Sequence, residues 1–319
     1  MKHASADGKG TASLGTKERL IRARNVAIMA LLVAVLAGEV DAAAPGTGNS
    51  PRPAGQGRVP ANTPPVVTLL KSGTQPRKVL RFQPKAGDKQ IVAFTMKMAM
   101  DPSPLTNLPP IVGTMQITIK SVSATGEIAY ERIITDVSVS AGAGTTAQDK
   151  EFMQVAFSKL KGLTTSGVIS SRGFIRRTDI KIPKSGEALP AIARLFLGFM
   201  NKDLQIIAAP LPEEAVGVGG EWEVKPAQES PEGVEKAVYE IISIEGQRVS
   251  AKVTVTMSPS NQAPKGLTAT GGGAGETTID LGRIMPTKGN LAHRLEASGT
   301  VGGQDRAMKI QTYLRIDPN

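Results

Sequence analysis

Strict alternation of apolar and polar residues is the feature that most limits what this chain can fold into. Residues 248–258 (RVSAKVTVTMS) place valine, alanine and methionine on one side and lysine, serine and threonine on the other. Segments 90–100 and 113–122 show the same period of two, which is the period of a half-buried β-strand. Such strands pair into antiparallel sheets with one wet face. The predicted fold is therefore all-β, with a minor helical part.

Short turns between these strands predict hairpins. The expected strand pairs are 113–122 with 127–139, 165–170 with 174–182, 235–244 with 248–258, and 291–301 with 306–316. The first and last parts of the chain resemble each other in outline, which predicts two similar tandem β tracts. About twelve strands are too many to stay flat, so we expect a curled antiparallel sheet or open barrel. The glycine-rich stretch 259–275 is interpreted as a mobile loop.

A helix is expected between the two tracts. Its apolar stripe consists of Leu189, Ile192, Leu195, Phe196, Phe199 and Met200. This three- and four-residue spacing predicts a helix that begins near Glu187, with Ser185 as its N-cap, and whose clear part ends at Lys202. Such a wide apolar stripe needs cover, so the helix is predicted to pack on or plug the concave side of the sheet. A shorter helix is expected over 150–161.

The N-terminal region has the layout of a secretory signal peptide. Four basic residues between positions 17 and 24 precede an uncharged run over 26–37 (VAIMALLVAVLA), and cleavage is expected after Ala42. The run is shorter than the roughly 20 apolar residues of a membrane span, although a retained anchor is the alternative. We therefore expect an exported protein, periplasmic or extracellular, with no transmembrane anchor after cleavage.

These patterns divide the chain into five parts. The expected parts are a signal peptide over 1–42, a disordered Pro/Gly-rich tether over 43–78, a first β tract over 79–184, a central helix and connector over 185–210, and a second β tract over 211–319. Residues 79–319 are expected to form one compact unit.

Charge and composition restrict the partners. The net charge is +10 and aromatic residues make up only 3% of the chain. A basic exported protein suits an anionic envelope surface, whereas nucleic-acid binding is not expected because aromatic residues for base stacking are scarce. The chain has no cysteine, so no disulfide can contribute to its stability.

The residues available for catalysis are few. The chain has two histidines, of which one precedes the signal segment and the other, His293, stands alone in a strand. A Ser-His-Asp triad or a histidine-rich zinc site cannot be assembled from these. Glu213, Glu214, Glu221 and Glu223 surround Trp222, but they are interpreted as solvated rather than as a glycosidase pair. We expect no enzymatic activity, no catalytic residue, no metal and no cofactor.

Three methionines at alternating positions, Met96, Met98 and Met100, share one strand face. Rows of thioethers bind Cu(I) in exported copper-handling proteins, so copper binding is a remote alternative. The favoured interpretation is adaptable core filler, because apolar residues continue the same face.

Two short motifs carry a family resemblance. The chain has Gly87-Asp88 before a predicted strand, and residues 210–222 fit P-x-P-x-x-x-V-x-V-G-x-x-W. In these it resembles an uncharacterised family of exported bacterial proteins, catalogued as a domain of unknown function. The resemblance implies export and no established activity. A looser architectural analogy is to periplasmic lipoprotein carriers, whose curled sheet wraps helices around an apolar cavity.

The functional hypothesis is a non-catalytic exported protein that binds a lipid, another hydrophobic or amphipathic ligand, or an envelope partner. The expected ligand-binding residues on the concave face are Met96, Met98, Met100, Leu195, Phe196, Phe199 and Trp222. The alternative is a structural or scaffolding envelope protein whose interior is filled and takes no small ligand.

Overall fold

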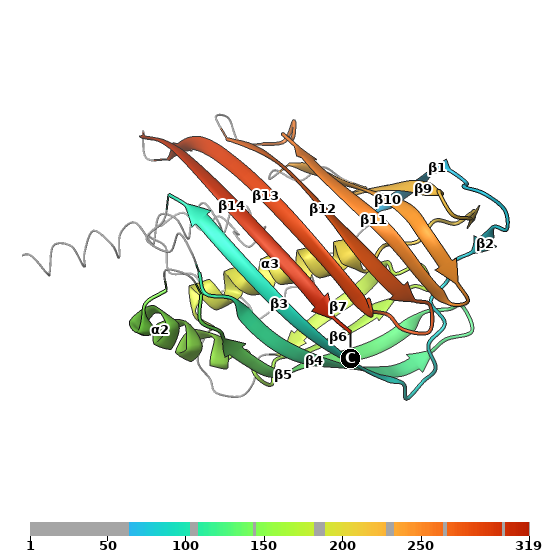
Figure 1. Ribbon diagram of the computed structural model, residues 1–319, viewed down its shortest axis with the longest axis horizontal. Helices are drawn as coiled ribbons and strands as arrows, with labels where there is room; N and C mark the ends of the chain where they lie inside the picture. Colours follow the sequence, from blue (N-terminus) through green and yellow to red (C-terminus); the bar gives the residue numbers. More distant parts are fainter. Residues whose placement is uncertain are drawn as a thin grey trace, which may run out of the picture.

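One antiparallel sheet of 12 strands dominates the fold (Figure 1). The computed structural model describes residues 64–102, 108–142, 145–181, 189–227, 233–263, 267–301 and 304–318. In chain order its strands are β1 (Val66–Lys71), β2 (Lys78–Val79), β3 (Lys89–Asp101), β4 (Ile111–Val122), β5 (Ile128–Val139), β6 (Thr164–Ile169), β7 (Ile175–Lys181), β8 (Ala215–Val216), β9 (Glu221–Lys225), β10 (Val234–Glu245), β11 (Arg248–Ser258), β12 (Thr268–Asp280), β13 (Lys288–Val301) and β14 (Gln304–Asp317). The predicted all-β fold with a minor helical part is confirmed.

The order of strands in the large sheet is β1-β9-β10-β11-β12-β13-β14-β3-β4-β5-β6-β7, and β2 pairs separately with β8. The predicted hairpins β4–β5, β6–β7, β10–β11 and β13–β14 are all present. Strand β14 pairs with β3, which joins the two tracts into one surface. The sheet curls without closing, so β1 and β9 at one end stay apart from β7 at the other. The tandem duplication itself stays a prediction.

Two helices accompany the sheet in the described ranges: α2 (Ala147–Ser158) and α3 (Ala191–Ile207). Helix α2 begins at a capping box in which Thr146 and Asp149 exchange hydrogen bonds, and it packs beside β5. Helix α3 runs along the concave side of the curled sheet, as predicted (Figure 1). Neither is long and apolar enough to cross a membrane.

Helix α3 is anchored by buried apolar residues along its length. Phe196 and Met200 are fully buried, and the Phe196 ring meets the Phe157 ring of α2 edge to face at 5.0 Å. The clear part of the predicted pattern ends at Lys202, and α3 continues beyond it to Ile207. Leu204 and the following isoleucines pack into the core, so tertiary contacts extend the helix past its polar residues.

The beginning of α3 also differs from the prediction. Pro190 occupies the N-cap position with an extended backbone and no side-chain cap, and the helix begins at Ala191. The proline ring has the fixed φ that suits a helix start, and its missing N–H is not needed there. The predicted N-cap Ser185 and the predicted start Glu187 lie outside the described residues.

The proposed tether over 43–78 contains ordered structure. Strand β1 pairs with β9, and Lys71 forms a 2.6 Å ion pair with Glu221. Val67 and Leu69 pack against the core, so this part of the prediction is wrong. The Pro/Gly-rich composition gives no local signal for strand β1, because its partner β9 lies far along the chain. The predicted signal peptide and the first part of the tether, residues 1–63, lie outside the described residues.

The predicted loop over 259–275 is wrong in its second half, which belongs to β12. Gly271, Gly273 and Gly275 lie opposite β13 so closely that a Cβ at each would come within 2.4, 2.5 and 2.0 Å of a backbone carbonyl oxygen. Glycine in a strand marks such close backbone approach. The glycine tract therefore lets the sheet curl tightly here rather than breaking it.

Candidate ligand-binding cleft

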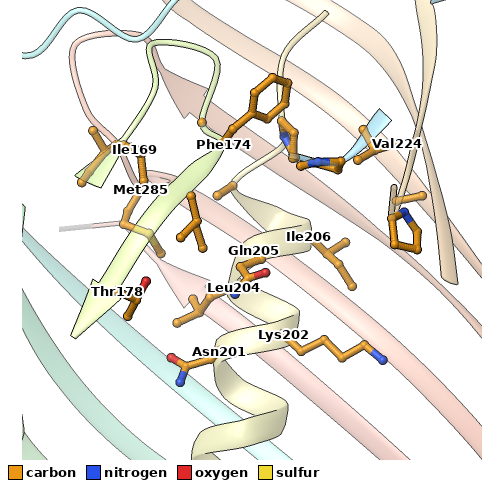
Figure 2. Close-up of a pocket in the computed structure, with 18 of the residues that line it drawn as sticks. Ile169, Phe174, Thr178, Asn201, Lys202, Leu204, Gln205, Ile206, Val224 and Met285 are labelled. Carbon is orange, nitrogen blue, oxygen red and sulfur yellow. The ribbon is translucent and has the colours of Figure 1, made fainter. Parts of the chain in front are cut away.

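A cleft of about 770 Å³ lies where the curled sheet fails to close. Its floor is the C-terminal half of α3, and its two walls are β5–β7 on one side and β9–β11 on the other (Figure 2). Its lining side chains are mostly apolar, and they include Phe82, Ile169, Phe174, Ile175, Ile180, Leu204, Ile206, Val224, Ala237, Met257, Ile284 and Met285. Most of these side chains are buried, whereas Ile175, Val224 and Met285 are half-buried and Ile180 is exposed.

The side chain that best shows the openness of the cleft is Ile180 of β7. It is 55% exposed although it faces the concave side of the sheet, where the equivalent residues of β3 are buried. Strand β7 is the last in the sheet, and the exposure of Ile180 shows that its concave side is left partly uncovered. Isolated exposed apolar residues are normal on proteins, but one that continues a concave apolar lining points to a binding surface.

The floor of the cleft is the polar stripe of α3. Asn201 and Gln205 are four residues apart and therefore lie on the same side of the helix, with Lys202 beside them (Figure 2). This stripe faces the gap between the two sheet ends, whereas the opposite side of α3 is buried. The gap explains why α3 carries polar residues in its second half.

Arg132 of β5 lies in the wall of the cleft, on the concave side of the sheet. Its Nη2 donates a 2.8 Å hydrogen bond to Oδ1 of Asn201. Burial lowers the pKa of the guanidinium, and the nearby Tyr130 opposes this weakly. An arginine nevertheless stays charged at neutral pH. Among the described residues, no carboxylate lies within ion-pair distance of Arg132, so its charge is uncompensated.

Three further charged side chains line the cleft within the described part of the chain. Lys202 of α3 forms a 2.7 Å ion pair with Glu235 of β10, which links the floor to one wall. Lys225, at the end of β9, stands at the rim. With Arg132, the described lining has three cations and one carboxylate. The cleft is therefore apolar with a positive bias.

The C-terminal end of α3 is held by side chains of the sheet. Tyr239 Oη donates to the carbonyl of Ile206 at 2.7 Å, and Thr277 Oγ1 donates to the carbonyl of Ile207 at 2.8 Å. Trp222 Nε1 donates to the carbonyl of Pro210 at 2.8 Å. The Thr277 hydroxyl replaces a backbone donor that the helix end lacks, and the other two bonds tie the end of α3 and the following Pro210 to the sheet. The floor of the cleft is thus fixed to the sheet before any ligand arrives.

The side chain of Tyr239, which anchors the C-terminal end of α3, is buried away from solvent. Its ring stacks on Trp222 with a centroid distance of 5.2 Å and an interplanar angle of 14°. Burial raises the pKa of the Tyr239 phenol far above its ordinary value, and the charge of Glu235 adds to the effect. The hydroxyl therefore stays a neutral donor.

A buried polar cluster lies beneath α3. His293 Nδ1 is 3.7 Å from Asp203 Oδ1, and His293 Nε2 is 3.9 Å from Glu235 Oε2. Thr312 donates to the other oxygen of Asp203 at 3.1 Å. The carboxylates contact opposite nitrogens of the ring, so they do not converge on one metal position. In the described ranges, no group of three such residues is arranged so that it could hold a metal ion.

The histidine was expected to stand alone, and the structure corrects that expectation. His293 is a strand residue, as predicted, but it is buried between two carboxylates. The sequence did contain a clue, because Asp203 follows Met200 by three residues and lies on the apolar side of the helix. A carboxylate in that position needs a polar partner across the interface.

Five of the seven predicted binding residues are buried, and the other two are half-buried. Met96, Met98 and Met100 are buried on the concave face of β3, and Phe196 is buried on α3. Leu195 and Phe199 are half-buried against the same core. None of these six, nor Trp222, lines the described part of the cleft. The methionines fill the core in this structure, and Trp222 is a core anchor.

The glutamates near Trp222 form ion pairs with basic side chains. Glu213 contacts Arg172 at 3.5 Å, and Glu223 contacts Lys236 at 3.7 Å. Glu221 pairs with Lys71, as described above. Each of these three carboxylates therefore points toward a cation of its own.

The residues that matter most at the cleft are Arg132 and Asn201, and sequence reasoning missed both. The available clue was the strand period, because Arg132 follows Tyr130 by two residues and precedes Ile134 by two. A charged residue at an inward position of an otherwise half-apolar strand is unusual and indicates a polar partner or a functional site.

Comparison with known proteins adds little. The chain matches no model of a known protein family and no curated protein. Among solved structures, it is similar to Rv2717c from M. tuberculosis, with 10% sequence identity, a TM-score of 0.21, and coverage of 71% of this chain and 91% of that one. At that TM-score the likeness supports no functional argument.

Proposed function

We propose that this chain is a non-catalytic exported protein that binds an apolar or amphipathic ligand in the cleft between the ends of its curled sheet. The observation that carries the proposal is the cleft itself. Its volume of about 770 Å³ falls within the roughly 300–1,000 Å³ of small-molecule sites. Its apolar walls and few polar groups are the usual composition of such sites.

Preorganisation supports the same proposal. The end of α3 is tied to the sheet through Tyr239, Thr277 and Trp222, so the floor needs little reordering when a ligand enters. A preformed site avoids much of the entropic cost of binding. The ligand would lie along α3, with its apolar part against Leu204 and Ile180.

The alternative is a scaffolding envelope protein with a filled interior. The interior beneath α3 is indeed filled by one continuous core cluster. The cleft lies on the other side of α3, where Ile180 is exposed and Ile175, Val224 and Met285 are half-buried. This difference between the two sides of one helix favours a ligand. The anionic envelope surface stays a second proposed partner, because the net charge of +10 favours it.

The test uses a neutral apolar dye, Nile red, with the full chain. Thr178 of β7 lines the cleft and is exposed, so Thr178→Trp places an indole in the binding space without removing core contacts. Tryptophan also suits a strand. We expect Nile red affinity to fall at least about tenfold, equivalent to about 1.4 kcal/mol.

The matched control is Arg177→Trp, one residue earlier on the same strand. Arg177 pairs with Asp179 on the opposite face of the sheet, away from the cleft. The control should bind Nile red as the unaltered protein does. If the unaltered protein fails to bind the dye, or if both variants behave alike, the cleft is not the binding site. Native mass spectrometry of protein from its own host would then show whether any ligand copurifies.

A further inference from the structure

Arg132 is a charged group in a place that suits an anion. It lies on the concave side of β5, in the wall of the cleft, where burial already disfavours its charged form. Placing a charge in an apolar environment without a partner is costly, so such groups are ordinarily paired. In the described chain, Arg132 donates a side-chain hydrogen bond to the neutral amide oxygen of Asn201. A negatively charged ligand can therefore supply the counter-charge that Arg132 lacks.

The neighbours of Arg132 on each packed element are neutral. Tyr130 is on its own strand, Ile117 is opposite on β4, Thr165 is opposite on β6, and Asn201 contributes from α3. The one carboxylate in the described lining, Glu235, belongs to the far wall and pairs with Lys202.

The hydrogen bond to Asn201 orients the guanidinium. With Nη2 engaged by α3, the planar group is fixed, and its other N–H donors remain for a second acceptor. A fixed guanidinium binds carboxylates and phosphates through two parallel hydrogen bonds, which a lysine cannot match. The local geometry therefore suits an acceptor with two oxygens.

We infer that the ligand of the cleft is an anionic amphiphile, whose carboxylate or phosphate head binds Arg132 and whose hydrocarbon part lies along Leu204 and Ile180. This inference rests on the proposed function and adds the chemical class of the ligand. Lys225 at the rim adds to the positive potential that draws an anion toward the cleft.

The experiment measures displacement of Nile red from the full chain by four amphiphiles with the same twelve-carbon chain. They are dodecanoate, dodecyl phosphate, dodecanol and dodecyltrimethylammonium, with the ionic compounds used below their micelle concentrations and dodecanol below its solubility limit. The anions should displace the dye at about 10- to 100-fold lower concentration than dodecanol, as expected for a hydrogen-bonded charge pair. The cation should be the weakest. The ratio between dodecanoate and dodecyl phosphate identifies which head is preferred.

Variants connect the preference to Arg132. In Arg132→Gln, the anions should displace the dye only at concentrations close to that of dodecanol. Nile red binding itself should persist. Arg132→Lys keeps the positive charge and loses the parallel N–H donors of the guanidinium. This variant should recover part of the preference for the anions. Arg177→Gln makes the same charge change on the outer face of β7 and should leave the preference unchanged.

The outcomes separate the two proposals. No dye binding by the unaltered protein overturns the proposed function. Dye binding with equal displacement by dodecanoate and dodecanol overturns the anionic ligand and leaves the cleft as an apolar site. The head-group series on the unaltered protein decides this even if Arg132→Gln does not fold. A preference that survives unchanged in folded Arg132→Gln also refutes the role of Arg132.

Discussion

Replacing Thr277 by valine should loosen the C-terminal end of α3. Valine keeps the shape and branching of threonine and removes only the hydroxyl that donates to the carbonyl of Ile207 at 2.8 Å. That carbonyl has no backbone donor to take over: Pro210, three residues on, lacks an N–H, and the N–H of Leu211, four residues on, donates to Arg172 instead. Thr277 and Ile207 are both buried, so water cannot compensate.

The expected cost follows from this geometry. Leaving a buried acceptor unsatisfied costs about 1–3 kcal/mol, and Thr277→Val should lie near the middle, at about 2 kcal/mol. Tyr239→Phe is the comparison, because it removes the bond to the carbonyl of Ile206. That carbonyl keeps a 3.1 Å hydrogen bond from the N–H of Ala209. Tyr239→Phe should therefore cost less, at about 1 kcal/mol.

Equilibrium urea unfolding is the assay. The chain has one tryptophan, Trp222, which lies at the anchored end of α3, so its fluorescence reports this region directly. The slope of the transition should stay constant, so that a shift in midpoint reports the free energy of unfolding. The reasoning is refuted if Thr277→Val costs less than about 0.5 kcal/mol, or no more than Tyr239→Phe.

Three further predictions concern the core and the sheet. Burial raises the pKa of Tyr239, so its contribution to stability should be complete below the ordinary phenol pKa of about 10 and should decline as the pH rises beyond it. Phenolate absorbance should show one of the three tyrosines ionising only as the protein unfolds, and a gradual titration of all three in the folded state would contradict this. Gly273→Ala should destabilise the sheet by about 1–3 kcal/mol, because its Cβ would lie 2.5 Å from a carbonyl oxygen of β13. Gly272→Ala should cost less, because its Cβ would lie 3.1 Å from the nearest atom. Equal unfolding midpoints of the two variants in urea would refute the argument for curvature. Phe196→Ala should lower the free energy of unfolding by about 3–5 kcal/mol, measured in urea beside Phe152→Ala on the exposed side of α2, which should change it little.

Much of the fold could be predicted because its signals are local. The alternation in β3, β4 and β11 follows from the geometry of one strand, and the hairpins follow from short turns between neighbours. The apolar stripe of α3 likewise identified a helix that needs cover. These features depend on a few consecutive residues, so they are readable without knowledge of their partners.

The elements that sequence reasoning missed depend on distant partners. Strand β1 exists because β9, far along the chain, supplies its hydrogen bonds. Strand β12 contains a glycine tract that is unfavourable in isolation, and it is a strand because β11 and β13 pair with it on both sides. The last two turns of α3 persist because their buried residues meet the sheet.

By itself the sequence determined the all-β class, the hairpins and the presence of an apolar helix to fill the sheet, since each follows from side-chain periodicity. Only the tertiary structure decided which side of that helix is covered and which stays open. The pairing of β14 with β3 joins the two tracts into one curled sheet, and the cleft lies between the ends of that sheet, which stay apart. Arg132 and Asn201 lie on different elements, and they become neighbours only when the curled sheet wraps α3.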